Sequence, residues 1–91
     1  MNDKSPKSMK ILVTGGTGYI GSHTVVELQN NGHEVVIIDD LSNSTADVLD
    51  RIAQITGKKP EFAQFNLTDK NTLFQFFQQH RDIQAIVHFA A

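Results

Sequence analysis

A glycine cluster between an apolar run and a helical pattern constrains this chain most strongly. Gly16, Gly18 and Gly21 fit the spacing G-x-G-x-x-G, and Gly15, Gly18 and Gly21 fit the wider spacing G-x-x-G-x-x-G. The cluster directly follows the apolar run Ile11-Leu12-Val13. A continuous β-branched and leucine run is typical of a strand buried on both faces. The segment therefore predicts a buried strand, a tight turn and a helix N-terminus in immediate succession.

Each glycine has a physical role in such a turn. The first permits a sharp exit from the strand, Gly18 lacks a β-carbon and so lets a ligand approach the backbone, and Gly21 lets the helix pack against the sheet. The N–H groups and the helix dipole then favour an anion, which predicts a pyrophosphate site. The alternative to a pyrophosphate site is a flexible turn without a ligand. A nucleotide-hydrolase phosphate loop is excluded because no Gly-Lys-Ser/Thr follows.

The rest of the chain alternates apolar runs with helical patterns. Ile20, Thr24, Val25 and Leu28 predict one helix face, and Gly32 is expected to end that helix. Three further strands are predicted, over Val35–Ile38, Glu61–Asn66 and Asp82–Ala90; the last has Ala85, Val87 and Phe89 on one face and Ile86 on the other. A second helix follows the capping residues 42–45, ends at Gly57, and has on one face Ala46, Leu49, Ile52 and Ala53. A third helix is capped by Thr68 or Asp69 and has on its apolar face Leu73, Phe76, Phe77 and His80.

This order of strand, helix, strand, helix, strand, helix, strand predicts the α/β class. Strands that alternate with helices form a parallel sheet with right-handed crossovers and helices on both faces. We expect a partial Rossmann fold, a doubly wound sheet with strand order 3-2-1-4. Residues 1–8 are expected to form a flexible tail, and residues 9–91 the dinucleotide-binding part. Ala91 falls within or just after an apolar strand, whereas domain boundaries usually lie in polar linkers, so we expect a domain that is cut short.

Asp39 ends the second predicted strand, roughly 20 residues after the glycines, where a carboxylate can accept the ribose hydroxyls of adenosine. A carboxylate there would repel a 2′-phosphate, and no arginine stands beside it, so NAD is favoured over NADP. The alternative is that Asp39 or Asp40 only caps the next turn.

Composition excludes several other functions. The 91-residue chain has no cysteine, which excludes disulfides, thiolate metal sites and cysteine nucleophiles. Its net charge of -2 gives no basic surface, so nucleic acid is not expected as a partner. No apolar run is long enough to span a membrane, and no secretory signal is apparent, which favours a cytoplasmic protein. The four histidines lack metal-ligand spacing, so no metal site is predicted. The phenylalanines of the second half are expected to lie mostly on core faces rather than to form a stacking platform for bases.

Three stretches of the sequence resemble the extended short-chain dehydrogenase/reductase family and, within it, the UDP-glucose 4-epimerases. They are Met9–Thr24 with the glycine cluster, Val36–Ser44 with Asp-x-Leu-x-Asn-Ser, and Ile86-Val87-His88-Phe89-Ala90. The glycine cluster is shared by the whole superfamily, whereas the loop after Asp39 is more particular to the epimerases.

The resemblance implies NAD as cofactor and a set of residues around it. They are Gly15, Gly18, Tyr19 and Ile20, together with Gly21, at the pyrophosphate; Asp39, Asp40, Asn43 and Ser44 at the adenosine ribose; Asn66 and Leu67 at the adenine; and Phe89, Ala90 and Ala91 at the nicotinamide. Asp40 stands where these enzymes often carry asparagine, and Asn66 where they usually carry aspartate. An amide can accept from the adenine amino group without charge assistance, so weaker adenine binding is expected. Ala91 stands where glycine is frequent.

Such enzymes interconvert UDP-glucose and UDP-galactose through a 4-keto sugar, with a tyrosine of a Tyr-x-x-x-Lys helix as general base. Tyr19 is the only tyrosine here and is followed four residues later by His23, so no catalytic residue is assigned. We therefore expect the NAD-binding portion of an NAD-dependent isomerase of UDP-sugars, inactive alone. Two alternatives remain: a nucleotide-sugar dehydratase or decarboxylase, and a non-enzymatic dinucleotide-binding module. Self-association through the last strand is also expected, because unpaired strand edges attract other strands.

Overall fold

The computed structural model describes residues 8–42 and 45–89, and in these ranges the predicted order of elements is confirmed. Four parallel strands pair in the order β3-β2-β1-β4, as expected. The elements are β1 (Lys10–Thr14), α1 (Tyr19–Asn30), β2 (Glu34–Asp39), α2 (Asp47–Thr56), β3 (Glu61–Gln64), α3 (Lys70–Gln79) and β4 (Ala85–His88). Predictions for residues 1–7, Asn43, Ser44, Ala90 and Ala91 lie outside the described residues.

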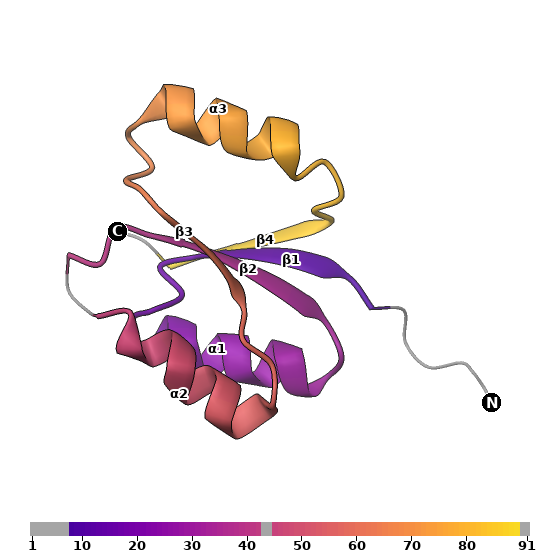
Figure 1. The fold of residues 1–91 in the computed structure, drawn as a ribbon. Helices are drawn as coiled ribbons and strands as arrows, with labels where there is room; N and C mark the ends of the chain where they lie inside the picture. The colour runs from indigo at the N-terminus through magenta and orange to yellow at the C-terminus, as the bar shows by residue number, and fades with distance from the viewer. Residues whose placement is uncertain (1–7, 43–44, 90–91) are drawn as a thin grey trace.

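The sheet separates two apolar layers, with α1 and α2 on one face and α3 on the other (Figure 1). Successive strand side chains point to opposite faces. Ile11, Val13 and Ile37 therefore pack with Val25 of α1 and with α2, whereas their neighbours Leu12, Val36 and Ile38 pack with Phe76 of α3. Burial on both faces explains why the central strands β1 and β2 read as unbroken apolar runs.

Helix α1 ends as the sequence predicts, but its buried face differs. Gly32 has φ 89°, and the Gly32 and His33 amides donate to the carbonyls of Gln29 (3.0 Å) and Leu28 (3.1 Å), which closes the last turn. The buried positions are Gly21, Val25 and Gln29. Ile20 does not share this face: it is 64% exposed in the first turn, so its placement on the core face is wrong.

The later strands and helices are shorter than the sequence predicts. β3 ends at Gln64 rather than Asn66, because its neighbour β2 ends at the paired residue Asp39. β4 begins at Ala85 rather than Asp82 and pairs with β1 from Ile11 onward. α2 begins at Asp47 after Ala46, which makes no side-chain cap. The predicted cap of α3 is confirmed, since the Asp69 carboxylate accepts from the Thr72 amide at 3.2 Å.

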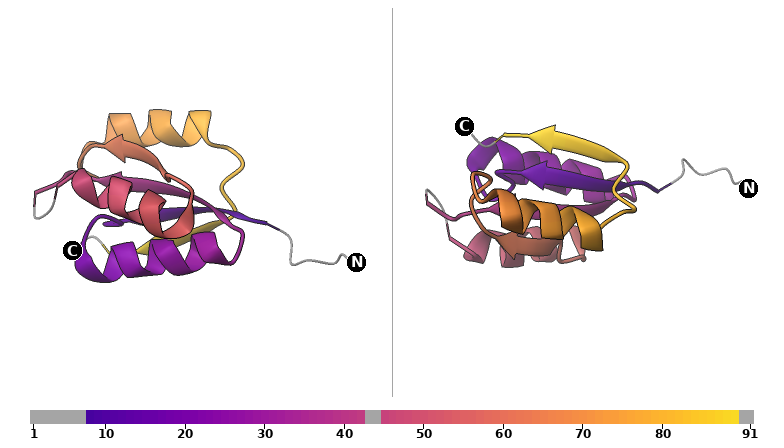
Figure 2. Two further views of the ribbon diagram at one scale, coloured as in Figure 1. Left: turned by 60° about the horizontal axis from the view of Figure 1, so that its bottom comes forward. Right: turned by 90° about the horizontal axis from the view of Figure 1, so that it is seen from above.

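Helix α3 buries less of its aromatic surface than the sequence suggested. Phe76 is buried, but Phe77 is 36% exposed, so its expected core position is wrong. Phe74, which was not among the residues predicted for the apolar face, is 65% exposed. The view from above shows the cause: α3 lies over the β3 side of the sheet and leaves β4 uncovered on that face (Figure 2, right). Ile86 of β4, on this face, is accordingly 57% exposed. Across the described ranges, no helix combines the length and apolar character that a membrane crossing requires.

Candidate functional site

The glycine turn follows β1 at the carboxyl edge of the sheet and is fixed to both neighbours of β1. The Gly15 amide donates to the Ile38 carbonyl of β2 at 2.9 Å, and the Gly18 amide donates to the Gly15 carbonyl at 3.2 Å, which closes the turn. Gly15 has φ 75°, a backbone conformation that other residues rarely adopt. On the other side, the Thr14 carbonyl accepts from the Phe89 amide at 2.8 Å. The strands beneath the turn therefore fix the position of its backbone.

The remaining glycines of the turn differ in what surrounds them. A β-carbon on Gly21 would lie 2.2 Å from the Gly15 carbonyl oxygen, and one on Gly16 would lie 2.8 Å from the Ile37 side chain. A β-carbon on Gly18 would meet only the Gly15 oxygen at 3.5 Å, which is an ordinary contact. The fold thus requires glycine at Gly16 and Gly21 but not at Gly18. Free space over the backbone at Gly18 is what a bound phosphate group needs.

Helix α1 begins directly after this turn and presents an uncapped N-terminus. No side chain caps it, and its first turn holds no acidic residue. The amides of Tyr19, Ile20 and Gly21 precede the first intrahelical donor, the Ser22 amide, which bonds the Gly18 carbonyl at 2.8 Å, and so they point out of the helix end. Tyr19 is 81% exposed, with its ring edge-to-face on His23 at 4.8 Å between centroids. The helix end offers N–H donors and positive potential to an anion above Gly18.

Asp39 faces this turn across the β1–β2 boundary. Its Oδ2 accepts from the Thr17 amide at 3.2 Å and the Thr17 hydroxyl at 2.5 Å, and its Oδ1 accepts from the Leu41 amide at 2.9 Å. The turn-capping interpretation is confirmed, since Oδ1 caps the following turn, while Oδ2 reaches the glycine turn. About one of the four acceptor positions of the carboxylate is left for an outside donor. The carboxylate is thus placed beside the glycine turn.

A second polar group continues the same edge toward β3. Asn66 Nδ2 donates to Asp40 Oδ2 at 3.0 Å, and Asp40 Oδ1 accepts from the Ser42 amide at 3.0 Å. The bonds from the Ser42 backbone and side chain hold the pKa of Asp40 below its usual value of 3.8. Leu41, between Asp40 and Ser42, has φ 61°, a strained conformation for a bulky side chain. The loops after β2 and β3 are thereby joined.

The carboxyl end of β4 lies on the opposite side of β1. Phe89 is 39% exposed there, and His88 Nδ1 lies 2.5 Å from the hydroxyl of the buried Thr14. The sequence singled out Phe89 but gave no role to Thr14, Thr17 or His88. Of these, only Thr17, which stands between two glycines, offered a signal. The expected site residues Gly15 to Gly21, Asp39, Asp40, Asn66, Leu67 and Phe89 thus share the carboxyl edge, whereas Asn43, Ser44, Ala90 and Ala91 lie outside the described residues.

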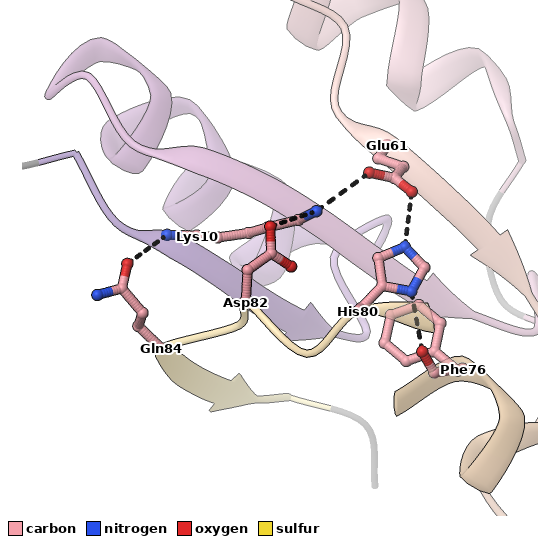
Figure 3. A network of polar contacts seen from close by, with 6 residues as sticks. All are labelled: Lys10, Glu61, Phe76, His80, Asp82 and Gln84. Atoms are coloured by element: carbon pink, nitrogen blue, oxygen red, sulfur yellow. Dashed lines mark hydrogen bonds and ion pairs between the residues drawn. The ribbon is translucent and has the colours of Figure 1, made fainter. Parts of the chain in front are cut away.

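The opposite edge of the sheet holds a separate charged network (Figure 3). Lys10 Nζ lies 3.8 Å from Glu61 and 3.4 Å from Asp82, and Glu61 also contacts His80 Nε2 at 2.7 Å. Lys10 and Glu61 begin their strands, so this network lies at the amino edge, away from the glycine turn. Among the residues that the structure describes, no group of three or more histidine, aspartate or glutamate side chains is arranged to hold a metal ion.

Comparison with known proteins gives one family match. The model of the NAD dependent epimerase/dehydratase family matches residues 11–91. Among curated proteins, the UDP-glucose 4-epimerase of Bacillus subtilis is 51% identical over 82 residues, which cover 90% of this chain and 24% of that protein. The bifunctional protein GAL10 of Pachysolen tannophilus is 56% identical over 81 residues, covering 89% of this chain and 12% of that protein.

Solved structures agree with the sequence matches. The UDP-glucose 4-epimerase of Stenotrophomonas maltophila, crystallised with NAD and formylated UDP-arabinopyranose, superposes with a TM-score of 0.85 at 53% identity over 91% of this chain and 24% of its own. The enzyme of Bifidobacterium longum, in complex with NAD+ and UDP, gives 0.87 at 36% identity, with the same two coverages. The chain thus spans about a quarter of the length of these relatives.

Proposed function

Because this chain belongs to the NAD dependent epimerase/dehydratase family, we propose that its carboxyl edge binds NAD in a UDP-glucose 4-epimerase. The observation that carries the proposal is the contact of Asp39 with Thr17, which places a carboxylate beside the glycine turn. A dinucleotide needs a phosphate cradle and a ribose-binding acid side by side, and this edge supplies both.

The order of the strands supports one direction for the cofactor. Gly15 and Gly18 at the end of β1 would hold the pyrophosphate, and Asp39 at the end of β2 would hold the adenosine ribose. Asn66 and Leu67 after β3 would then border the adenine, and Phe89 after β4 would border the nicotinamide. Bound there, NAD would supply a hydride acceptor for the sugar.

The residues of this chain bind and orient rather than catalyse. In the proposed enzyme, the amides at the start of α1 hold the pyrophosphate, and the exposed Tyr19 and Ile20 side chains shield it from water. By the resemblance, the general base for the epimerisation of UDP-glucose and UDP-galactose is the tyrosine of a Tyr-x-x-x-Lys helix, and Tyr19 lacks that lysine. The chemistry is therefore assigned to the intact enzyme and the cofactor site to this segment.

Calorimetry on the intact protein tests the cofactor assignment. NAD should bind about tenfold or more tightly than NADP, because the Asp39 carboxylate repels a 2′-phosphate, and Asp39→Ala should weaken NAD by a similar factor. Asp50→Ala, which removes an exposed carboxylate of α2 that pairs with Lys59, is the matched control and should leave NAD affinity unchanged. Equal affinity for NAD and NADP would contradict the assignment. Interconversion of UDP-glucose and UDP-galactose by the same protein tests the substrate.

A further inference from the structure

We propose that Asp40, rather than Asn66, accepts the hydrogen bond from the adenine amino group and so sets the base specificity of the site. The inference rests on the proposed NAD site and concerns its adenine end. Two side chains with acceptor oxygens, Asp40 and Asn66, meet where the loops after β2 and β3 join. Adenine presents an exocyclic amino group that needs an acceptor. The question is which of the two side chains has an oxygen to offer.

Asn66 has its acceptor oxygen already occupied. Its Oδ1 accepts from the Thr68 amide at 2.9 Å and from the Thr68 hydroxyl at 2.8 Å. A carboxamide oxygen has two lone pairs, so these bonds use its full capacity. The two bonds also fix the amide orientation: Nδ2 must then face Asp40, as observed at 3.0 Å. At this site Asn66 is a donor.

Asp40 keeps acceptor capacity beside this donor. Its carboxylate accepts from the Ser42 amide, from the Ser42 side chain and from Asn66 Nδ2, three bonds against about four acceptor positions. The carboxylate is only half-buried, and the same bonds favour its ionised form. A charged acceptor also binds a donor more strongly than a neutral amide does. The role that sequence resemblance gave to Asn66 therefore passes to its partner.

Binding of two dinucleotides to the intact protein tests this assignment. The probes are NAD and nicotinamide hypoxanthine dinucleotide, which carries a carbonyl oxygen in place of the adenine amino group. The wild-type protein should prefer NAD by on the order of tenfold to a hundredfold, the range expected for one bond to a charged acceptor. Asp40→Ala should lose most of this preference. Asp40→Asn, which restores a neutral acceptor, should recover part of it.

Asn66→Ala is the matched variant, because it removes the amide and leaves the carboxylate. It should keep the preference for NAD within about threefold, since the charged acceptor remains. Loss of the preference in Asn66→Ala, or its survival in Asp40→Ala, would overturn the inference while NAD binding itself stood. Absence of NAD binding by the folded wild-type protein would instead refute the proposed function and this inference with it. Thermal unfolding of each variant establishes that the substitutions at Asp40 and Asn66 leave the fold intact.

Discussion

Gly18 and Gly21 lie three residues apart in one turn, but only one of them is required by the fold. Gly18 has φ -73° and ψ 174°, which any residue can adopt, and a β-carbon there has room. Gly21 has the Gly15 carbonyl where its β-carbon would stand. The two positions therefore separate the structural from the ligand-binding demands on the glycine turn.

Two alanine variants make this distinction measurable. Gly21→Ala should destabilise the protein by about 1 to 3 kcal/mol through overpacking, even though alanine is the better helix former. Gly18→Ala should change the free energy of unfolding by less than about 1 kcal/mol but weaken NAD binding about tenfold or more, since its methyl group occupies the phosphate position. Denaturant unfolding and calorimetry on both variants check the pair. Unchanged NAD affinity in Gly18→Ala would argue against the phosphate cradle.

At the scale of residues, the sequence predicted which residues belong to the candidate site better than it predicted their hydrogen-bond partners. The glycines and Asp39 were found from spacing, because the spacing itself is a physical requirement of the turn. The bond between Thr17 and Asp39 joins residues 22 positions apart and depends on the pairing of β1 with β2, so no local pattern encodes it. Ile20 was misplaced because helical periodicity does not tell which side of the first turn faces solvent.

At the scale of elements, the network at the amino edge holds α3 and the turn before β4 against β1 and β3. His80 Nδ1 lies 2.9 Å from the Phe76 carbonyl and Nε2 lies 2.7 Å from Glu61, while its ring stacks on Phe76. Both partners only accept, so both ring nitrogens must donate, which requires the imidazolium form. Four residues scattered from Lys10 to Asp82 meet here only because the strands are parallel and in this order, which sequence patterns alone could not predict.

This network predicts a pH-dependent stability. Burial and the positive charge of Lys10 lower the pKa of His80, and Lys10 itself pairs with Asp82. The bonds from His80 to Glu61 and to the Phe76 carbonyl outweigh both effects and raise the pKa above 6.5. A raised folded-state pKa stabilises the protein fully below the unfolded value, and this stability is lost as pH rises through the folded value. The unfolding free energy of wild type minus that of His80→Gln should therefore fall as pH rises above 6.5.

Chemical denaturation between pH 5 and pH 9, on the order of two units either side of the histidine pKa, checks this difference. His23→Gln is the control, because His23 lies exposed on α1 and contacts only the Tyr19 ring among the interactions described. A difference for His80→Gln that stays flat, or that grows with pH, would contradict the imidazolium assignment.

At the scale of the whole molecule, the sheet is covered unevenly. β4 pairs only with β1 in the described sheet, and α3 leaves its outer face open. Ile86 and Phe77 are exposed there, beside a hollow of about 440 Å³ that His80, Arg81 and Ile83 also line. The topology and the two apolar layers followed from alternating apolar runs. The sequence did not predict that α3 leaves β4 uncovered, because periodicity gives the apolar face of α3 but not its lateral position over the sheet.

The open strand predicts that the 91-residue chain self-associates. Exposed apolar edges pair with other strands, whereas charged residues on an edge prevent this. Light scattering should show an apparent mass that rises with concentration, and Ile86→Glu should reduce it, whereas Ile55→Glu on exposed α2 surface should not. A concentration-independent monomer in the wild-type chain would refute this expectation.

Hydrogen exchange of the intact protein with and without NAD tests the central claim most directly, because it reports where the dinucleotide contacts the backbone. We predict that NAD protects the amides of residues 15–21 and 39–41 and leaves those of the amino-edge turn, residues 80–84, unchanged. Protection confined to the amino edge, or no protection at the glycine turn under saturating NAD, would contradict the account.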